Sequence, residues 1–212
     1  MSEAIDIRLK RARSWLHKAR LVASPHDLDA KFIYLWIAFN ALYGTPRYRL
    51  MGKPERSESD DFKLFLGKIE EVSYCAIENG LRPLAAAIEK VMRSHFLDIE
   101  CWKRWDHEGI RDRQERISSA RNVYAEGLNL DQLFLRIYTL RNQILHGAAT
   151  DGGQRNRESL KCATPILYTA VKVFIALVDK HRTELAGLDP VPFPPSLGEG
   201  GRFNVPRLKR GL

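Results

Sequence analysis

Residues 32–39 read Phe-Ile-Tyr-Leu-Trp-Ile-Ala-Phe and form the longest apolar run in the 212-residue chain. The run is apolar on every side of a helical wheel, which is typical of a helix buried inside a bundle. A β-strand would give a similar run, but the length of the segment and the absence of partner strands favour the helix. We therefore predict a buried helix that begins near residues 25–29, with Ser24 as its N-cap, and that ends at Tyr43.

Helical spacing of apolar residues continues on both sides of this run. Leucine, isoleucine and phenylalanine recur at helical spacing over residues 130–145, and Asn129 with Gln132 is typical of a capping box at the start of that helix. Gly80 and Gly127 are expected to end the helices before them, and Pro165 to bend the last helix or restart it. The spacing predicts an all-α protein with helices over residues 3–22, 25–43, 60–79, 81–105 (one or two helices), 110–126, 129–146 and 157–184.

The composition changes after residue 186. Prolines and glycines become frequent there, and the last residues are basic. A segment of this kind cannot bury enough apolar surface to build a core. We expect one helical domain over residues 1–186 and an extended, basic, Pro/Gly-rich tail over residues 187–212.

Charge and cysteine content narrow the class of protein. There are 34 lysines and arginines against 26 acids, a formal charge of +8, which favours nucleic acid as a partner. The sequence has 3 cysteines and no CxxC pair, which argues against a disulfide framework and fits a reducing compartment. There is no signal-peptide pattern and no uninterrupted apolar stretch of about 18 residues, so we predict a cytoplasmic protein without a membrane partner. The set His95, Cys101 and His107 lacks a usual zinc spacing, and neither a metal nor a cofactor is predicted.

The segment Arg141-Asn142-Gln143-Ile144-Leu145-His146 stands at the end of the helix predicted over residues 129–146. In this composition, an arginine followed five residues later by a histidine is expected about 0.6 times by chance, and about 0.02 times with asparagine directly after the arginine. The ordinary interpretation is a helix end, where Arg and His suit the exposed carbonyls and the helix dipole. From spacing alone, a helix end and a chemical site both stay open.

The segment from Arg141 to Gly147 resembles the R-N-x-x-x-H signature of the HEPN superfamily (higher eukaryotes and prokaryotes nucleotide-binding). Residues 32–44 resemble the early buried helix of its Apea-like and abortive-infection branches. The resemblance implies an up-down antiparallel helical bundle with additional helices, which forms a homodimer. It also implies metal-independent cleavage of single-stranded RNA at a composite site, with one Arg/His pair from each protomer. Many relatives act in toxin–antitoxin, anti-phage or RNA-processing roles.

The proposed chemistry suits these residue types. An imidazole titrates near neutral pH, so His146 can serve as general acid or general base. Arg141 stays charged and can grip phosphate oxygens, and Asn142 can orient the site or bind phosphate. On a helix, positions 141 and 146 lie about 140° apart. Arg141, His146 and Asn142 are the expected catalytic residues, and which histidine acts as acid stays open.

One position departs from a known pattern of the superfamily. Relatives that pair with a nucleotidyltransferase antitoxin commonly carry a tyrosine two residues after the histidine, where this chain has Ala148. An antitoxin or another protein partner therefore stays an open expectation. Two other functions also stay open: a non-catalytic RNA- or nucleotide-binding module, and an interaction protein that docks a partner through its bundle face and tail. Asn40 is expected to be buried with a hydrogen-bond partner, and Tyr43 to border the groove.

Overall fold

The computed structural model describes residues 2–22, 27–44, 57–99, 127–146, 153 and 156–185. The regular elements within these ranges are all helical and none is a strand, so the predicted all-α class is confirmed. They are α1 (Ser2–Leu21), α2 (Leu28–Tyr43), α3 (Glu58–Leu81), α4 (Ala85–Arg93), α7 (Leu130–Leu145) and α8 (Arg157–Lys180), with the short 3-10 helices η2 (Arg82–Leu84) and η3 (His95–Leu97).

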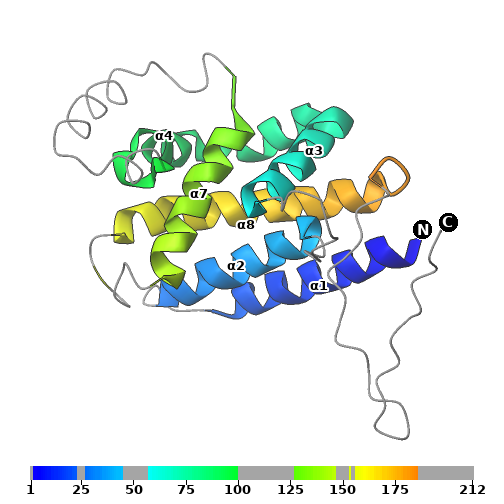
Figure 1. The fold of residues 1–212 in the computed structure, drawn as a ribbon, viewed down its shortest axis with the longest axis horizontal. Coiled ribbons are helices and arrows are strands. Elements are labelled where there is room, and N and C mark those ends of the chain that lie inside the picture. Colours follow the sequence, from blue (N-terminus) through cyan, green and yellow to red (C-terminus); the bar gives the residue numbers. More distant parts are fainter. Residues whose placement is uncertain are drawn as a thin grey trace, which may run out of the picture.

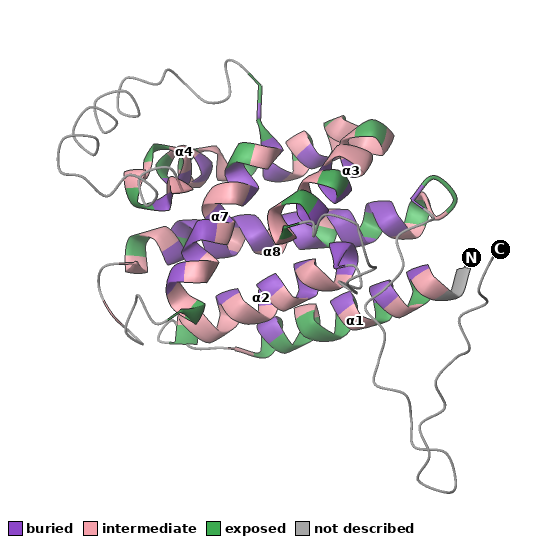
Figure 2. Cartoon of the chain, viewed as in Figure 1, coloured by how far each residue is buried: buried purple, intermediate pink, exposed green. Residues whose placement is uncertain are grey.

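α8 is the central helix of the fold. It contacts α1, α2, α3, α4 and α7, and it runs across the middle of the molecule, between α1 and α2 on one side and α3 and α4 on the other (Figure 1). Its predicted apolar stripe is confirmed, since every member is buried (Ile166, Leu167, Val171, Phe174, Ile175 and Val178). Figure 2 shows the buried residues concentrated along this helix and on the faces turned toward it.

α8 is also the one helix in the described ranges that is long and apolar enough to cross a membrane. A search for an uninterrupted apolar stretch does not find this helix, because Thr164, Thr169 and Lys172 interrupt its apolar residues. Most of the apolar window is buried inside the fold, as the central helix of a helical protein requires.

Phe39 of α2 stands at the centre of an aromatic core. Its ring centroid lies 4.7 Å from that of Phe134 on α7, 6.1 Å from Phe65 on α3 and 5.9 Å from Phe174 on α8. α2 thus meets neighbours in several directions, which explains why residues 32–39 are apolar all round. The predicted buried helix is confirmed.

Tertiary contacts set both ends of α2. The helix begins at Leu28, and its N-cap is Asp27, not the predicted Ser24; the Asp27 side chain makes no capping hydrogen bond. At the other end, Arg8 of α1 is 2% exposed and donates a hydrogen bond of 2.8 Å to the carbonyl of Leu42. Arg8 thus supplies a hydrogen-bond donor to a carbonyl at the C-terminal end of α2, a role that a basic residue in the last turn of a helix often has.

α3 extends beyond the predicted range of residues 60–79 at both ends. Ser57 starts it with a capping box, in which its hydroxyl accepts from the Asp60 N–H at 3.2 Å and the Asp60 carboxylate accepts from the Ser57 N–H at 3.0 Å. Gly80, predicted to end the helix, lies inside it. A Cβ there would lie 2.8 Å from Cγ2 of Val173, so this glycine serves the close approach of α3 to α8 rather than a stop.

α7 starts where the sequence predicts. Oδ1 of Asn129 accepts a hydrogen bond of 2.9 Å from the Gln132 N–H, and Gly127, just before, has a φ of +88° that favours glycine. The predicted stripe is buried as far as Leu140, but Leu145 at the end of the helix is 49% exposed. The apolar pattern alone therefore placed Leu145 in the core wrongly.

Pro165 neither breaks nor restarts α8, which is one helix from Arg157 to Lys180 and ends before the predicted Glu184. Proline removes one hydrogen bond of the helix ladder. Packing of the buried residues around it against the other helices outweighs this local loss.

Several predictions fall outside the described residues. They are the helix over residues 110–126, the tail over residues 187–212, and the side chains of Cys101, His107 and Ala148.

Candidate functional site

The segment 141–146 forms the C-terminal end of α7. Arg141 and Asn142 lie together, because Nη1 of Arg141 donates a hydrogen bond of 2.8 Å to Oδ1 of Asn142. His146 is the residue that follows the last turn, and its backbone N–H donates to the Asn142 carbonyl at 2.9 Å. The main chain thus links the three predicted site residues within one helix end.

Arg141 is anchored by an acidic residue from another helix. Nη1 of Arg141 lies 3.3 Å from Oε2 of Glu58, the first residue of α3, and both side chains are less than one-fifth exposed. The other carboxylate oxygen, Oε1, accepts a hydrogen bond of 2.9 Å from the hydroxyl of Tyr43. A chain of three polar side chains therefore runs from the end of α2 through α3 to α7.

Burial and Glu58 raise the pKa of Tyr43 far above its ordinary value. The phenol is therefore protonated at neutral pH and acts as a donor to the carboxylate. Tyr43 was expected to border the groove, but it is 1% exposed. It meets the site through its hydrogen bond to Glu58 and through its ring, whose centroid lies 6.4 Å from that of Trp36.

Two aromatic rings enclose the guanidinium of Arg141. Its Cζ lies 5.8 Å from the ring centroid of Trp36 and 5.7 Å from that of Tyr138, within the range of cation–π attraction. Nε of Arg141 and Nε1 of Trp36 are buried and have no hydrogen-bond partner in the described part of the chain. Buried hydrogen-bond donors are nearly always paired in folded proteins. Two donors without a partner in the described part of the chain, one of them on the Arg141 guanidinium itself, are therefore unusual.

Among the described residues, the hydrogen bond of the Arg141 guanidinium is donated by Nη1, and Nη2 donates none. The guanidinium is held on its Nη1 side by Glu58 and Asn142. This orientation is fixed by the fold before any ligand binds.

His146 differs from Arg141 in its surroundings. The residue is exposed, and its ring has no partner among the described residues. No contact joins the imidazole to the Arg141 guanidinium, consistent with their angular separation on the helix. A single chain therefore brings together Arg141 and Asn142, and it presents His146 to solvent at the adjoining helix end.

Sequence reasoning missed Glu58, Trp36 and Tyr138 as members of the site. Trp36 was assigned only to the buried helix, and Tyr138 only follows Ile137 of the apolar stripe. Glu58 sits next to a capping serine, and acids are common there for the local reason of the helix dipole. No spacing signal links Trp36 or Glu58 to Arg141, because they lie on α2 and α3. Tyr138 lies on α7 three residues before Arg141, a spacing that places two side chains on one face of a helix, and this signal was available in the sequence.

Other predicted positions take ordinary roles. Asn40 is half-buried rather than buried. The ring of His95 stacks on Phe96 with centroids 3.8 Å apart. Among the described residues, no group of three or more His, Cys, Asp or Glu side chains is placed to hold a metal ion.

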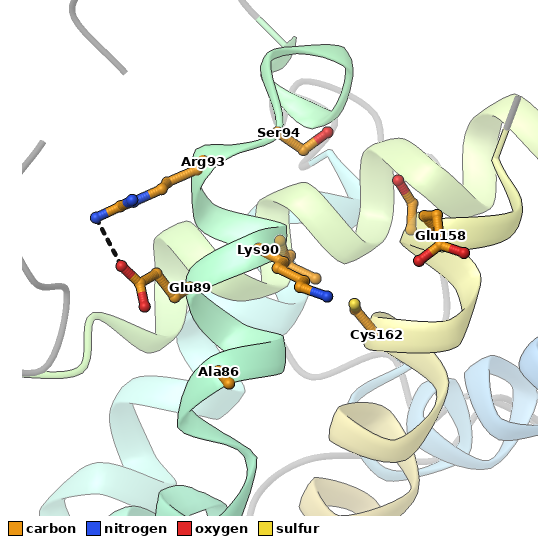
Figure 3. Close-up of a pocket in the computed structure, with 9 residues that line it drawn as sticks. Ala86, Glu89, Lys90, Arg93, Ser94, Glu158 and Cys162 are labelled. Atoms are coloured by element: carbon orange, nitrogen blue, oxygen red, sulfur yellow. Dashed lines mark ion pairs between the residues drawn. The ribbon is translucent and has the colours of Figure 1, made fainter. Parts of the chain in front are cut away.

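A cavity of about 670 Å³ lies between α4 and the start of α8. Lys90 and Cys162 point toward one another across it (Figure 3), and burial raises the pKa of the Cys162 thiol. The charges of the cavity lining are balanced, because Glu89 pairs with Arg93 at 2.6 Å and the two other charged residues, Glu158 and Lys90, have opposite signs. A protonated thiol in a neutral groove is a poor nucleophile, and we assign no chemistry to this cavity.

Comparison with known proteins leaves the family open, because no family model, no curated protein and no solved structure matches the chain.

Proposed function

We propose that the chain is a HEPN-type, metal-independent endoribonuclease that cleaves single-stranded RNA at a site shared by two copies. The observation that supports it most directly is the arrangement of segment 141–146. Arg141 is held in a fixed orientation by Glu58 and Asn142, and His146 is exposed at the same helix end. The formal charge of +8 supports an anionic substrate.

The proposed reaction uses one histidine as base and another as acid, and the proposed site therefore takes one His146 from each of two copies. One His146 accepts the proton of the RNA 2′-OH, and the 2′ oxygen forms a bond to phosphorus. The bond from phosphorus to the 5′ oxygen then breaks, and the second copy's His146 gives a proton to that leaving oxygen. The products are a 2′,3′-cyclic phosphate and a free 5′-hydroxyl.

Arg141 and Asn142 take separate roles in this proposal. Nη2 of Arg141 stabilises the negative charge that develops on the phosphate oxygens. Asn142 accepts from Nη1 and so holds the guanidinium plane, which makes it a positioning residue. Exposed Leu145, directly before His146, supplies apolar surface for contact with the second copy.

The resemblance to the superfamily completes the proposal. It includes the up-down bundle, the homodimer and a role as a toxin or in anti-phage defence, all of which rest on the motif at residues 141–146 and the buried segment 32–44.

The test is cleavage of a labelled single-stranded RNA by the full chain in EDTA, with the product ends identified by mass. We expect 2′,3′-cyclic phosphate ends and a loss of about 100-fold or more in His146→Ala. His181→Ala is the matched control, because His181 also directly follows the last residue of a helix. Full activity of His146→Ala, or equal loss in both variants, would contradict the assignment.

Arg141 requires a more careful variant. Arg141→Ala would leave Glu58 without its counter-charge and could unfold the end of α7. Arg141→Lys keeps a charge near Glu58 but removes the second nitrogen of the fork. We expect Arg141→Lys to melt near the wild-type temperature and to lose most cleavage; wild-type cleavage by a folded Arg141→Lys would remove Arg141 from the mechanism.

The second candidate is an RNA- or nucleotide-binding module without catalysis. The ion pair with Glu58 weighs against catalysis by Arg141, because the carboxylate offsets part of the positive charge that would stabilise the phosphate in the transition state. The formal charge of +8 would still attract RNA. In that case RNA affinity would fall with salt, and no product would form at any concentration of the chain.

A further inference from the structure

A cavity of about 450 Å³ lies where α1 ends, α2 begins and the first half of α8 passes. Its volume is within the range of small-molecule sites. None of its residues belongs to the nuclease proposal. The lining residues are Arg20, Leu28, Lys31, Thr164, Pro165 and Tyr168.

The lining is positively charged and has no compensating acid. Arg20 and Lys31 both line the cavity, while none of the lining residues is an Asp or Glu. Neither cation forms an ion pair with the described residues. The nearby acid of α2, Asp29, is paired with Arg157 at 3.0 Å. Within the described part of the chain, two cations without an ion pair therefore line one small cavity.

The position of Lys31 adds to this positive field. It stands near the N-terminus of α2, where the helix dipole already carries partial positive charge. A cation is normally disfavoured there, and an anion is favoured. Asp27 and Asp29 at this helix start offset part of the positive field, and a dianion bound between Arg20 and Lys31 would neutralise more of it.

The rest of the wall is apolar and partly flat. Leu28, Pro165 and the ring of Tyr168 contribute it, and Nζ of Lys172 lies 5.6 Å from the Tyr168 ring centroid. Thr164, in the same wall, is 3% exposed, and its hydroxyl has no hydrogen-bond partner in the described part of the chain. A ligand that fits this cavity combines a charged group with an apolar body.

We propose that this cavity binds a small organic phosphomonoester whose body is a planar or apolar ring. Two cations match the charge of a phosphomonoester, which is close to −2 at neutral pH, better than that of a single carboxylate. The ring lies against Pro165 and Tyr168. The site is independent of RNA cleavage, since it involves α1, α2 and α8 and none of the residues 141–146.

The test is calorimetric or NMR titration of the full chain with three probes. Phenyl phosphate carries both parts of the predicted ligand, inorganic phosphate carries the anion alone, and phenol carries the ring alone. We expect phenyl phosphate to bind at least about tenfold more tightly than either of the others, since each supplies only part of the contact.

Variants then locate the site. Lys31→Gln and Arg20→Gln should each weaken phenyl phosphate binding by about tenfold, the usual effect of one charge-assisted hydrogen bond. Lys90→Gln is the matched control, because Lys90 lines the other cavity, whose charges are balanced. Melting curves check that each variant is folded.

Three outcomes would overturn the proposal: no binding of phenyl phosphate at millimolar concentration, equal binding of inorganic phosphate, or wild-type affinity in both cavity variants. An equal loss in Lys90→Gln would overturn it too, because it would indicate a diffuse charge effect. RNA cleavage by the same variants is expected to be unchanged, so the two proposals fail separately.

Discussion

Nη1 of Arg141 lies 3.3 Å from Oε2 of Glu58, an ion pair that joins the C-terminal part of α7 to the first turn of α3. Because both side chains are mostly shielded from water, each charge depends on the other. Tyr43 extends the pair into the core through its hydrogen bond to Glu58. The orientation of the site therefore depends on an acid that belongs to a different part of the sequence.

Glu58→Gln should destabilise the fold by about 2–3 kcal/mol, because it leaves the Arg141 guanidinium partly buried without a counter-charge. Urea unfolding at neutral pH measures this. Glu71→Gln is the control, since Glu71 is exposed on the same helix, and it should change stability by no more than about 0.5 kcal/mol. Equal effects of the two variants would mean that the ion pair contributes nothing.

Tyr43→Phe removes the hydroxyl that donates to Glu58 and should cost about 1–3 kcal/mol. In a double-mutant cycle with Glu58→Gln, the two losses should be less than additive, because the amide oxygen of Gln accepts the Tyr43 hydrogen bond more weakly than the carboxylate does. Strict additivity would show that the two side chains do not interact in solution.

Alkaline pH should weaken the fold through Tyr43. Since its pKa is raised in the folded state, the unfolded chain releases this proton first, near the ordinary tyrosine value of about 10. The unfolding free energy should therefore fall as pH rises above about 10, with this residue contributing up to about 1.4 kcal/mol per pH unit. Urea unfolding across that range should show a shallower slope in Tyr43→Phe; an identical slope would contradict the burial of the phenol.

Two glycines of α3 should respond in opposite ways to alanine. At Gly80 the new Cβ would lie 2.8 Å from Val173, so Gly80→Ala should destabilise by about 1–3 kcal/mol. At Gly67 nothing lies within 4 Å of a Cβ, so Gly67→Ala should stabilise by about 0.5–1 kcal/mol through helix propensity. Thermal melts of the two variants decide it, and stabilisation by both would mean that α3 and α8 lie farther apart at Gly80.

Arg8→Met should cost about 2–3 kcal/mol, because it leaves the Leu42 carbonyl at the end of α2 without its buried donor. Methionine keeps much of the side-chain volume, so lost packing contributes little. Lys10→Met, at an exposed position of α1, is the matched control and should stay near wild type. A stable Arg8→Met would show that α2 does not need this cap.

The sequence by itself determined the all-α class, most helix positions, the burial of most of residues 32–39, the α7 stripe as far as Leu140 and the stripe of α8. It did so because helical periodicity, and with it the buried face of a helix, follows from residues that lie three and four positions apart. The Asn129 cap is likewise a contact between residues three positions apart. The same local rules placed Leu145 in the core and made Gly80 a stop, since they contain no information about where a neighbouring helix lies.

Only the tertiary structure decided the partners of Arg141, the exposure of His146, the role of Arg8 and the charged cavity at Arg20 and Lys31. The contacts of Arg141 with Glu58 and Trp36 depend on side chains that are far apart in sequence and that meet only when helices pack, whereas its contacts with Asn142 and Tyr138 are local to α7. Spacing along one helix sets the direction in which Arg141 points, but the packing of α3 against α7 decides that Glu58 is there to meet it.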